Sequence, residues 1–181
     1  MPVSPDFTIG GRSLVREALV ETGFYRGATT AAALRAGFAR VDSIELDVGR
    51  FLSGVKMFAN EPRVFLHRGS SPDVLPEVLD PRLPTTVYLD AHYMGPGHGD
   101  PDPAYGECPL MAELDVVGRV RWETRPILVV DDWHLFRRPW EEDLLARFDP
   151  AQWPEAGAVL ARLSGYEFVH TEFTLYAFPK G

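Results

Sequence analysis

Three aspartates follow two apolar segments that have the character of buried strands. Asp90 comes directly after Thr86 to Leu89, and Asp131 and Asp132 come directly after Ile127 to Val130. Neighbouring strands lie about 4.8 Å apart, so these carboxylates converge if the two segments are adjacent. Carboxylates that close either share protons or bind a cation, and oxygen ligands suit Mg²⁺ or Ca²⁺. The three residues are a predicted divalent-metal site, and the alternative is that one caps a helix while another faces solvent.

A turn with two glycines is the second candidate site. The segment from Glu21 to Thr30 reads ETGFYRGATT. Gly23 and Gly27 let the backbone approach a ligand closely, and the amides of a following helix favour a carboxylate or phosphate. Glu21 strengthens the prediction, because an acid at the end of a buried strand is costly unless it binds something. The alternative is a tight turn that needs glycine only for its geometry.

A further acidic residue has the position typical of nucleotide-binding sheets. Glu45 lies in the apolar segment Val41 to Leu46, 18 residues after Gly27. An acid about 20 residues beyond a glycine turn accepts hydrogen bonds from ribose hydroxyls in such sheets. Asp47 is suited to cap the helix that follows. We therefore predict a ribose-containing ligand at Glu45.

Two histidines and several aromatic residues accompany the aspartates. His92 and His134 each follow an aspartate by two residues, so each can act as a base or an additional ligand, although a lone histidine is more often structural. The segment after the fifth strand is rich in aromatic side chains, which either wall an acceptor pocket or form part of the core. These are Trp133, Phe136, Trp140 and Trp153.

Strand-like and helix-like segments alternate along the chain and must position these residues. The predicted strands are 15–22, 41–46, 63–67, 86–89, 127–130, 166–170 and 174–178, and the predicted helices are 28–36, 48–58, 71–79, 110–120 and 155–163. A Gly/Pro-rich loop is expected over 94–109. This alternation predicts an α/β fold with a doubly wound, mostly parallel, Rossmann-like seven-stranded sheet and a C-terminal antiparallel hairpin. Ligands bind such sheets beyond the carboxyl ends of the strands.

The composition excludes several classes of protein. The chain has 181 residues, with 18 basic and 26 acidic side chains and a net charge of −8, which disfavours a nucleic-acid partner. A single cysteine, Cys108, excludes a disulfide framework and a cysteine-based zinc cluster. No stretch has the about 18 to 20 consecutive apolar residues of a membrane span, and Met1 to Asp6 lack the pattern of a signal peptide. We therefore expect one domain over 1–181 in the cytoplasm, with no membrane partner.

Five segments, taken in order, resemble the successive motifs of class I S-adenosylmethionine (SAM)-dependent methyltransferases. The likeness is greatest to metal-dependent O-methyltransferases of the catechol type and of the macrolide-sugar type, and it runs from about residue 15 to residue 140. In the sugar-type enzymes an Asp-Asp-aromatic motif also follows the fifth strand. The matching segments are Glu21-x-Gly23-x-Tyr25-x-Gly27-x-Thr29, Ile44-Glu45, Gly69-Ser70-Ser71, Leu89-Asp90 and Val130-Asp131-Asp132.

The resemblance implies a role for each matching position. Gly23, Tyr25 and Gly27 would border the methionine part of SAM, with Thr29 near its carboxylate. Glu45 would hold the ribose, Ser70 and Ser71 would lie near the adenine, and Asp90, Asp131 and Asp132 would bind the metal. The full set implied to bind SAM is Glu21, Gly23, Phe24, Tyr25, Gly27, Thr29, Glu45, Leu46, Gly69, Ser70 and Ser71.

One departure from the catechol-type pattern concerns the general base. Those enzymes have a lysine three residues after the first metal aspartate, and Tyr93 stands there in this chain. His92, Tyr93 or a metal aspartate such as Asp90 must then take its place. The acceptor would be recognised by loop 94–109, by segment 133–150 or by a second subunit of a homodimer.

The predicted function is a SAM-dependent O-methyltransferase, assisted by Mg²⁺ or another divalent cation such as Ca²⁺, that acts on a small hydroxylated acceptor such as a sugar or a phenol. One alternative is a methyltransferase-like binding module without activity. Another is a metal-dependent hydrolase or transferase of phosphorylated substrates, in which the glycine turn and Glu45 would have no cofactor to bind.

Overall fold

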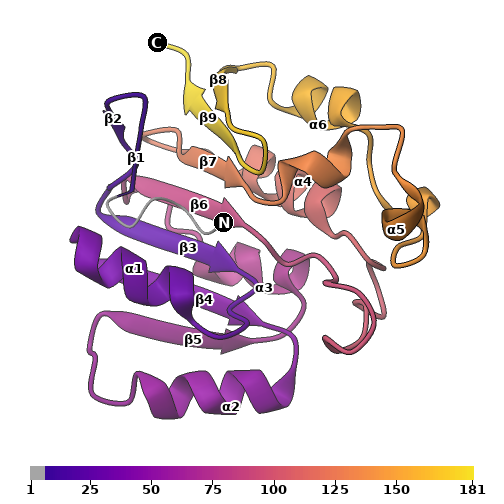
Figure 1. Cartoon of the computed structure of the whole chain (residues 1–181). Coiled ribbons are helices and arrows are strands. Elements are labelled where there is room, and N and C mark those ends of the chain that lie inside the picture. The colour runs from indigo at the N-terminus through magenta and orange to yellow at the C-terminus, as the bar shows by residue number, and fades with distance from the viewer. Residues whose placement is uncertain (1–6) are drawn as a thin grey trace.

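The computed structural model of the chain describes residues 7–181 (Figure 1). The segment Met1 to Asp6, in which no signal peptide was expected, lies outside the described residues. The described chain begins with a small antiparallel pair, β1 (Thr8–Ile9) and β2 (Arg12–Ser13). The sequence analysis did not predict this pair, because two-residue strands have no periodicity to detect.

Seven strands form the central sheet, as predicted. Their order across the sheet is β5-β4-β3-β6-β7-β9-β8, with β7 antiparallel to β9 and β9 antiparallel to β8. The other neighbouring pairs are parallel. The strands are β3 (Ala18–Thr22), β4 (Arg40–Glu45), β5 (Val64–Arg68), β6 (Thr85–Leu89), β7 (Ile127–Val130), β8 (Tyr166–His170) and β9 (Leu175–Pro179).

The strands nearest the middle of the sheet are covered on both faces. Every residue of β3, β6 and β7 is buried, which explains why they read as continuous apolar runs rather than as alternating patterns. The strand predicted from residue 15 begins only at Ala18, because Arg16 and Glu17 are exposed before the chain enters the sheet.

Five of the six helices agree with the prediction to within a few residues, and the short helix at Glu142–Leu145 was not predicted. Asp47 accepts a hydrogen bond from the amide of Arg50 at 2.8 Å and so caps α2, as expected. Ser70 rather than Ser71 is the residue that precedes α3. The helices are α1 (Ala28–Ala36), α2 (Val48–Met57), α3 (Ser71–Val78), α4 (Leu110–Arg119), α5 (Glu142–Leu145) and α6 (Ala156–Arg162), with short 3₁₀ turns at Trp133–Phe136 and Pro150–Gln152.

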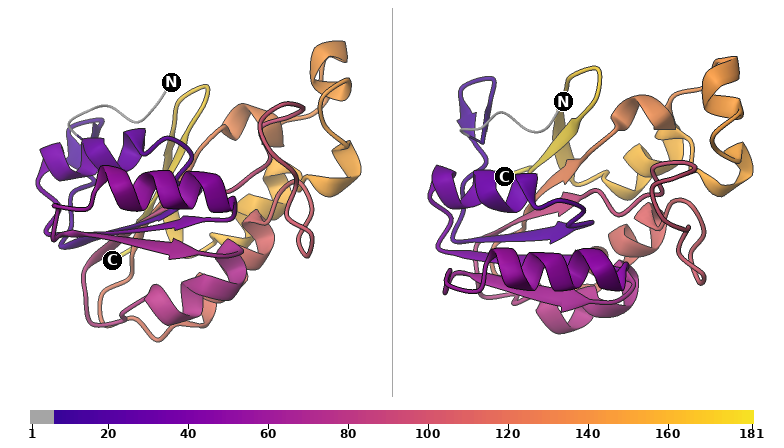
Figure 2. Two further views of the ribbon diagram at one scale, coloured as in Figure 1. Left: turned by 90° about the horizontal axis from the view of Figure 1, so that it is seen from below. Right: turned by 60° about the horizontal axis from the view of Figure 1, so that its bottom comes forward.

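Two separate cores hold the layers together. On one face, α1 and the N-terminal residues Phe7 and Leu14 pack with Tyr88 and Val129 of the sheet. On the other face, α3, α4 and α6 pack on side chains such as Val130 and on the aromatic residues of the C-terminal half. The five parallel strands thus end at one edge (Figure 1), and the loop after β6 and the α5 segment extend beyond that edge (Figure 2).

Across residues 7–181, none of the helices combines the length and the apolar character that a membrane span requires.

Candidate active site

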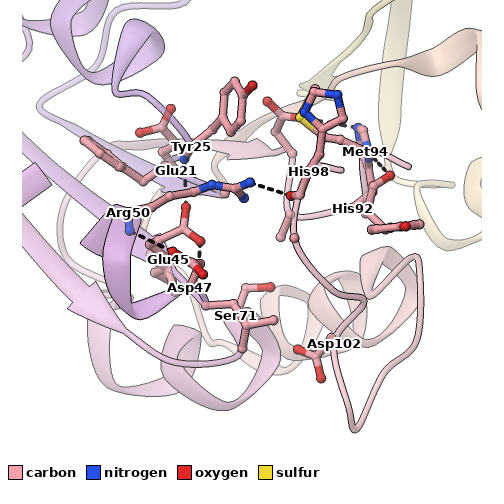
Figure 3. A pocket seen from close by; sticks show the side chains of 18 of the residues that line it. Glu21, Tyr25, Glu45, Asp47, Arg50, Ser71, His92, Met94, His98 and Asp102 are labelled. Carbon is pink, nitrogen blue, oxygen red and sulfur yellow. Dashed lines mark hydrogen bonds and ion pairs between the residues drawn. The ribbon is translucent and has the colours of Figure 1, made fainter. Parts of the chain in front are cut away.

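A pocket of about 640 Å³ opens at the carboxyl ends of the parallel strands (Figure 3). Its wall contains most of the residues predicted from the sequence, which come from the ends of β3, β4, β5, β6 and β7. Gly27 and Ser70 are not part of this wall and instead precede α1 and α3. The predicted residues in the wall are Glu21, Gly23, Phe24, Tyr25, Thr29, Glu45, Leu46, Gly69, Ser71, Asp90, His92, Tyr93, Asp131 and Asp132.

The turn after β3 needs its first glycine for two reasons. Gly23 has a left-handed φ of 80°, and a Cβ at this position would lie 2.8 Å from the carbonyl carbon of Asp90 and closer still to its oxygen. This close approach holds the turn against the chain that leaves β6. The neighbouring Phe24 is buried, and its ring meets Phe58 edge to face at a centroid distance of 6.1 Å. Phe24 therefore supports the turn from the core.

Glu21 is a buried carboxyl group beneath the pocket. One of its oxygens, Oε2, accepts hydrogen bonds from the hydroxyls of Thr30 and Ser43, both at 2.6 Å. Burial raises the pKa of Glu21 to about 7, and the two hydroxyls oppose this shift. Glu21 thus joins the ends of β3, β4 and α1 and places a titratable group in the pocket wall.

Glu45 uses both of its carboxylate oxygens to shape the pocket. Oε2 accepts a hydrogen bond from the amide of Tyr25 at 2.8 Å, and Oε1 accepts one from the amide of Asp47 at 2.8 Å. The residue is 5% exposed, and a carboxylate oxygen can accept more than one hydrogen bond. Two acceptor positions therefore remain for ligand hydroxyls, as the ribose prediction requires.

A buried carboxyl group that the sequence analysis missed lies next to the pocket, bonded to Ser71 of its wall. Glu113 of α4 is 1% exposed and accepts a hydrogen bond from the Ser71 hydroxyl at 2.5 Å. Burial raises its pKa to about 7. The spacing of the buried residues Leu110, Leu114 and Val117 places Glu113 on the apolar face of the helix. An acid on that face was the signal that could have identified it.

The Ser70 hydroxyl, next to Ser71 in the chain, is buried and has no hydrogen-bond partner among the described residues 7–181. A buried hydroxyl without a partner is rare. Ser70 is not part of the pocket wall, so it adjoins the site only through the neighbouring Ser71.

His92, which lines the pocket and also a small cavity shared with Glu113, lies between two aspartates. Its Nε2 is 3.2 Å from Oδ1 of Asp90 and 3.2 Å from Oδ2 of Asp132, and the side chain is 6% exposed. Burial lowers the pKa of His92, but the facing carboxylates of Asp132 and Asp90 raise it by more, to well above its ordinary value. The two facing carboxylates therefore favour the protonated form of the imidazole.

All three predicted aspartates lie in the pocket wall, but Asp131 differs from the other two in its hydrogen bonds. Its Oδ2 accepts a hydrogen bond from the Tyr88 hydroxyl at 2.5 Å, and its Oδ1 accepts one from the Thr174 hydroxyl at 3.0 Å. Tyr88 belongs to the core on the α1 face of the sheet. Asp131 thus ties β6, β7 and the C-terminal hairpin together, while Asp90 and Asp132 face His92.

The other two candidate bases have different surroundings. The ring of Tyr93 packs edge to face on Phe148, with centroids 6.3 Å apart. His134 is partly exposed, with Nδ1 3.9 Å from Oδ1 of Asp132, and burial lowers its pKa. Neither side chain is held between the two carboxylates as His92 is.

The aromatic segment after β7 is core rather than pocket wall. Trp133, Phe136, Trp140 and Trp153 are all buried in the core on the α4 face. Trp153 also packs against the ring of His92, with centroids 5.3 Å apart. Of the two alternatives left open for these residues, the structure supports the core.

The loop after β6 forms an outer wall that only partly matches the prediction. Residues 98–103 line the pocket together with Met94. The guanidinium of Arg50 reaches across from α2, donates to the carbonyl of His98 and lies 4.9 Å from the ring centre of Tyr25 (Figure 3). Nothing in the sequence joined Arg50 to this loop, because the contact depends on how far the loop folds back.

In the described part of the chain, residues 7–181, no group of three or more His, Cys, Asp or Glu side chains has a geometry that could hold a metal ion. The ligand set predicted from Asp90, Asp131 and Asp132 accordingly does not form, since Asp131 is bonded elsewhere and His92 lies between the other two.

This chain resembles known proteins in its structure but not detectably in its sequence. No protein-family model matches the chain, and no curated protein sequence matches it. Solved structures match over nearly the whole chain at low identity, and their names describe methyltransferases.

Three of these structures illustrate the likeness. The O-methyltransferase TomG from Streptomyces achromogenes, in complex with SAM, is 19% identical with a TM-score of 0.57 over 92% of this chain and 74% of its own. The SAH-bound methyltransferase PaMTH1 from Podospora anserina is 15% identical, with a TM-score of 0.56 over 91% and 72%. The N-terminal domain of EvdMO1, solved with SAH and D-fucose, is 14% identical with a TM-score of 0.52 over 91% and 77%.

The strand order, the C-terminal antiparallel hairpin and the pocket at the carboxyl ends of the strands agree with this likeness. The chain therefore has the fold of the class I SAM-dependent methyltransferases.

Proposed function

We propose that this chain is a SAM-dependent methyltransferase that transfers the methyl group to a hydroxyl oxygen of a small acceptor such as a sugar or a phenol. The observation that carries the proposal is one pocket that joins Glu45 and the glycine turn to Asp90, His92 and Asp132. A methyl donor and its acceptor must meet in a single enclosed site, because transfer requires the reacting atoms to be held in line. The names of the similar structures agree with methyl transfer.

The cofactor half of the proposal follows from the free hydrogen-bonding groups. The ribose hydroxyls would donate to the remaining lone pairs of Glu45. The adenine would lie beside Ser71, near the unpartnered hydroxyl of Ser70. The methionine carboxylate would face Thr29 and the amides of the first turn of α1, where a helix favours an anion.

The acceptor half follows from the charges at the other end. The acceptor oxygen forms a bond to the methyl carbon as the bond from that carbon to the sulfonium sulfur breaks, and the hydroxyl proton passes to a base of the protein. The carboxylates of Asp90 and Asp132 lie in the pocket wall and can accept this proton. The residues that bind and orient the two reactants thereby also remove the proton.

Metal assistance, which the resemblance implied, is not part of this proposal. Mg²⁺ and Ca²⁺ require several oxygen ligands directed at one point. Here Asp131 is bonded to Tyr88 and Thr174, and an imidazole separates Asp90 from Asp132. The side chains present do not fit the cation, so we derive no step that depends on one.

The test has two stages. Isothermal titration calorimetry with SAM and SAH measures cofactor binding, and absence of binding of either would refute the proposal. The protein is then incubated with methyl-labelled SAM and a panel of sugars and phenols, and products are detected by mass spectrometry. SAM binding without transfer to any acceptor would favour the binding module, and hydrolysis of phosphate esters without SAM binding would favour the phosphoryl-transfer alternative.

A further inference from the structure

The position of His92 carries an inference beyond methyl transfer itself. The side chain is almost completely buried, and its Nε2 is equally distant from one oxygen of Asp90 and one oxygen of Asp132, at 3.2 Å. Neither contact has the alignment of a hydrogen bond. The ring is thus shared between two carboxylates rather than bonded to one of them.

The ring is also held on its other sides. Nδ1 lies 3.3 Å from the carbonyl oxygen of Tyr93, and the ring packs against the indole of Trp153. Trp153 is fixed in turn, because its Nε1 donates to Glu107 at 2.8 Å in the buried core. A ring supported in this way has little freedom to swing out of the space between the carboxylates.

A divalent cation bound by both carboxylates would compete with this ring. Mg²⁺ binds oxygen at about 2.0–2.1 Å and Ca²⁺ at about 2.3–2.6 Å, so either ion must approach oxygens that His92 already faces. The third expected ligand, Asp131, has both oxygens bonded to hydroxyls of Tyr88 and Thr174. The two remaining carboxylates, those of Asp90 and Asp132, both face the ring of His92.

We propose that His92 is a positioning residue that takes the place of a divalent cation, holding Asp90 and Asp132 in the acceptor end of the pocket and excluding metal ions from it. Its placement in an acceptor site rests on the proposed function, but its effect on metal binding does not. Methyl transfer is then independent of divalent ions, and removal of the imidazole creates the cation site that the intact chain lacks.

The experiment measures Mn²⁺ binding to metal-free protein by electron paramagnetic resonance, for the unchanged chain and for His92→Ala. The matched control is His67→Ala, because His67 also contacts a buried aspartate, Asp42 at 2.9 Å, but lies away from the pocket and leaves Asp42 paired with Arg40. We expect His92→Ala to bind Mn²⁺ about tenfold or more tightly than the unchanged chain, since the ring that occupies the space facing both carboxylates is removed. The control should show no gain, and adding Asp132→Asn to His92→Ala should abolish the gain.

Two results would overturn the inference. The first is that the unchanged chain binds Mn²⁺ and that Asp90→Asn abolishes this binding. The second is that His92→Ala binds Mn²⁺ no more tightly than the His67→Ala control. Calorimetry with SAH in the presence of a chelator is run on every variant. It shows whether the pocket is intact, and failure of the unchanged chain to bind SAH would refute the proposed function while leaving the Mn²⁺ comparison valid. Where an acceptor has been found, we expect methyl transfer by the unchanged chain to persist in the presence of a chelator. We expect transfer by His92→Ala to be restored by Mg²⁺.

Discussion

Replacing Glu45 by glutamine tests the cofactor end of the site most directly. In the structure each oxygen of this buried carboxylate accepts one backbone amide, from Tyr25 and from Asp47, and each keeps a lone pair that points to no protein group. Glutamine offers one oxygen and one NH₂ group. One backbone amide would then face another donor, and one of the two ligand hydroxyls would lose its acceptor.

The magnitudes follow from these losses. A hydrogen bond to a charged group contributes about 1.5–3 kcal/mol, so the ligand-free Glu45→Gln protein should lose roughly that amount of unfolding free energy. The same loss at the ribose corresponds to a rise of about 10- to 150-fold in the dissociation constant of SAH. Urea unfolding measures the first quantity, and isothermal titration calorimetry measures the second.

Glu61→Gln is the matched control, because this substitution makes the same chemical change at a surface ion pair, the one between Glu61 and Arg63. Its effect on stability should be much smaller than that of Glu45→Gln, because solvent screens a surface pair, and SAH binding should be unaltered. If Glu45→Gln is destabilised but binds SAH within about a factor of two of the unchanged chain, Glu45 serves only to hold the turn, and the assignment of the ribose to it is refuted.

Three further predictions concern the support of the pocket. Burial raises the pKa of Glu21 from 4.5 to about 7, so the folded state keeps this proton to higher pH than the unfolded chain. The folded state therefore loses about 3 kcal/mol of stability as the pH rises through this range. Glu21→Gln should remove this pH-dependent component of stability, measured by urea unfolding between pH 5 and 8, and an unchanged pH profile would contradict the assignment. Gly23→Ala should lower the free energy of unfolding by at least about 2 kcal/mol, because of the left-handed φ and the clash with Asp90. A variant that unfolds at the same urea midpoint as the unchanged chain would contradict the close approach of the two backbones. Glu107→Gln should weaken two buried hydrogen bonds, and hydrogen exchange in loop 94–106 should become faster; unaltered exchange would show that the loop is held by other contacts.

The fold could be predicted because burial on both faces leaves a direct trace in the sequence. Ile127 to Val130 is a run of four apolar residues, all of them buried in β7, and the strand ends then place Glu21, Glu45 and Asp90 at one edge. The loop contacts left no such trace. Arg50 reaches His98 only because the chain after β6 folds back over α2, and a contact between segments 48 residues apart depends on tertiary structure that periodicity does not encode.

The hydrogen bonding of Asp131 is a different case, because the sequence contains the information needed to predict the face of the sheet on which this residue lies. Side chains alternate between the two faces of a sheet, and Val129 and Val130 belong to different cores in the structure. By the same alternation Asp131 follows the face of Val129, where it accepts the hydrogen bond from the Tyr88 hydroxyl, while it still borders the pocket.

The chain then leaves the strand at Asp132, which has a left-handed φ of 46°, and this turn brings its carboxylate to His92. Two consecutive aspartates after a strand therefore do not by themselves make a pair of metal ligands. One of them is bonded to the hydroxyls of Tyr88 and Thr174 and the other faces His92, and the residue that lies between Asp90 and Asp132 decides what these two can bind. In this chain that residue is a buried histidine at 3.2 Å from both, and the same two carboxylates that would hold a cation instead face the protein's own imidazole.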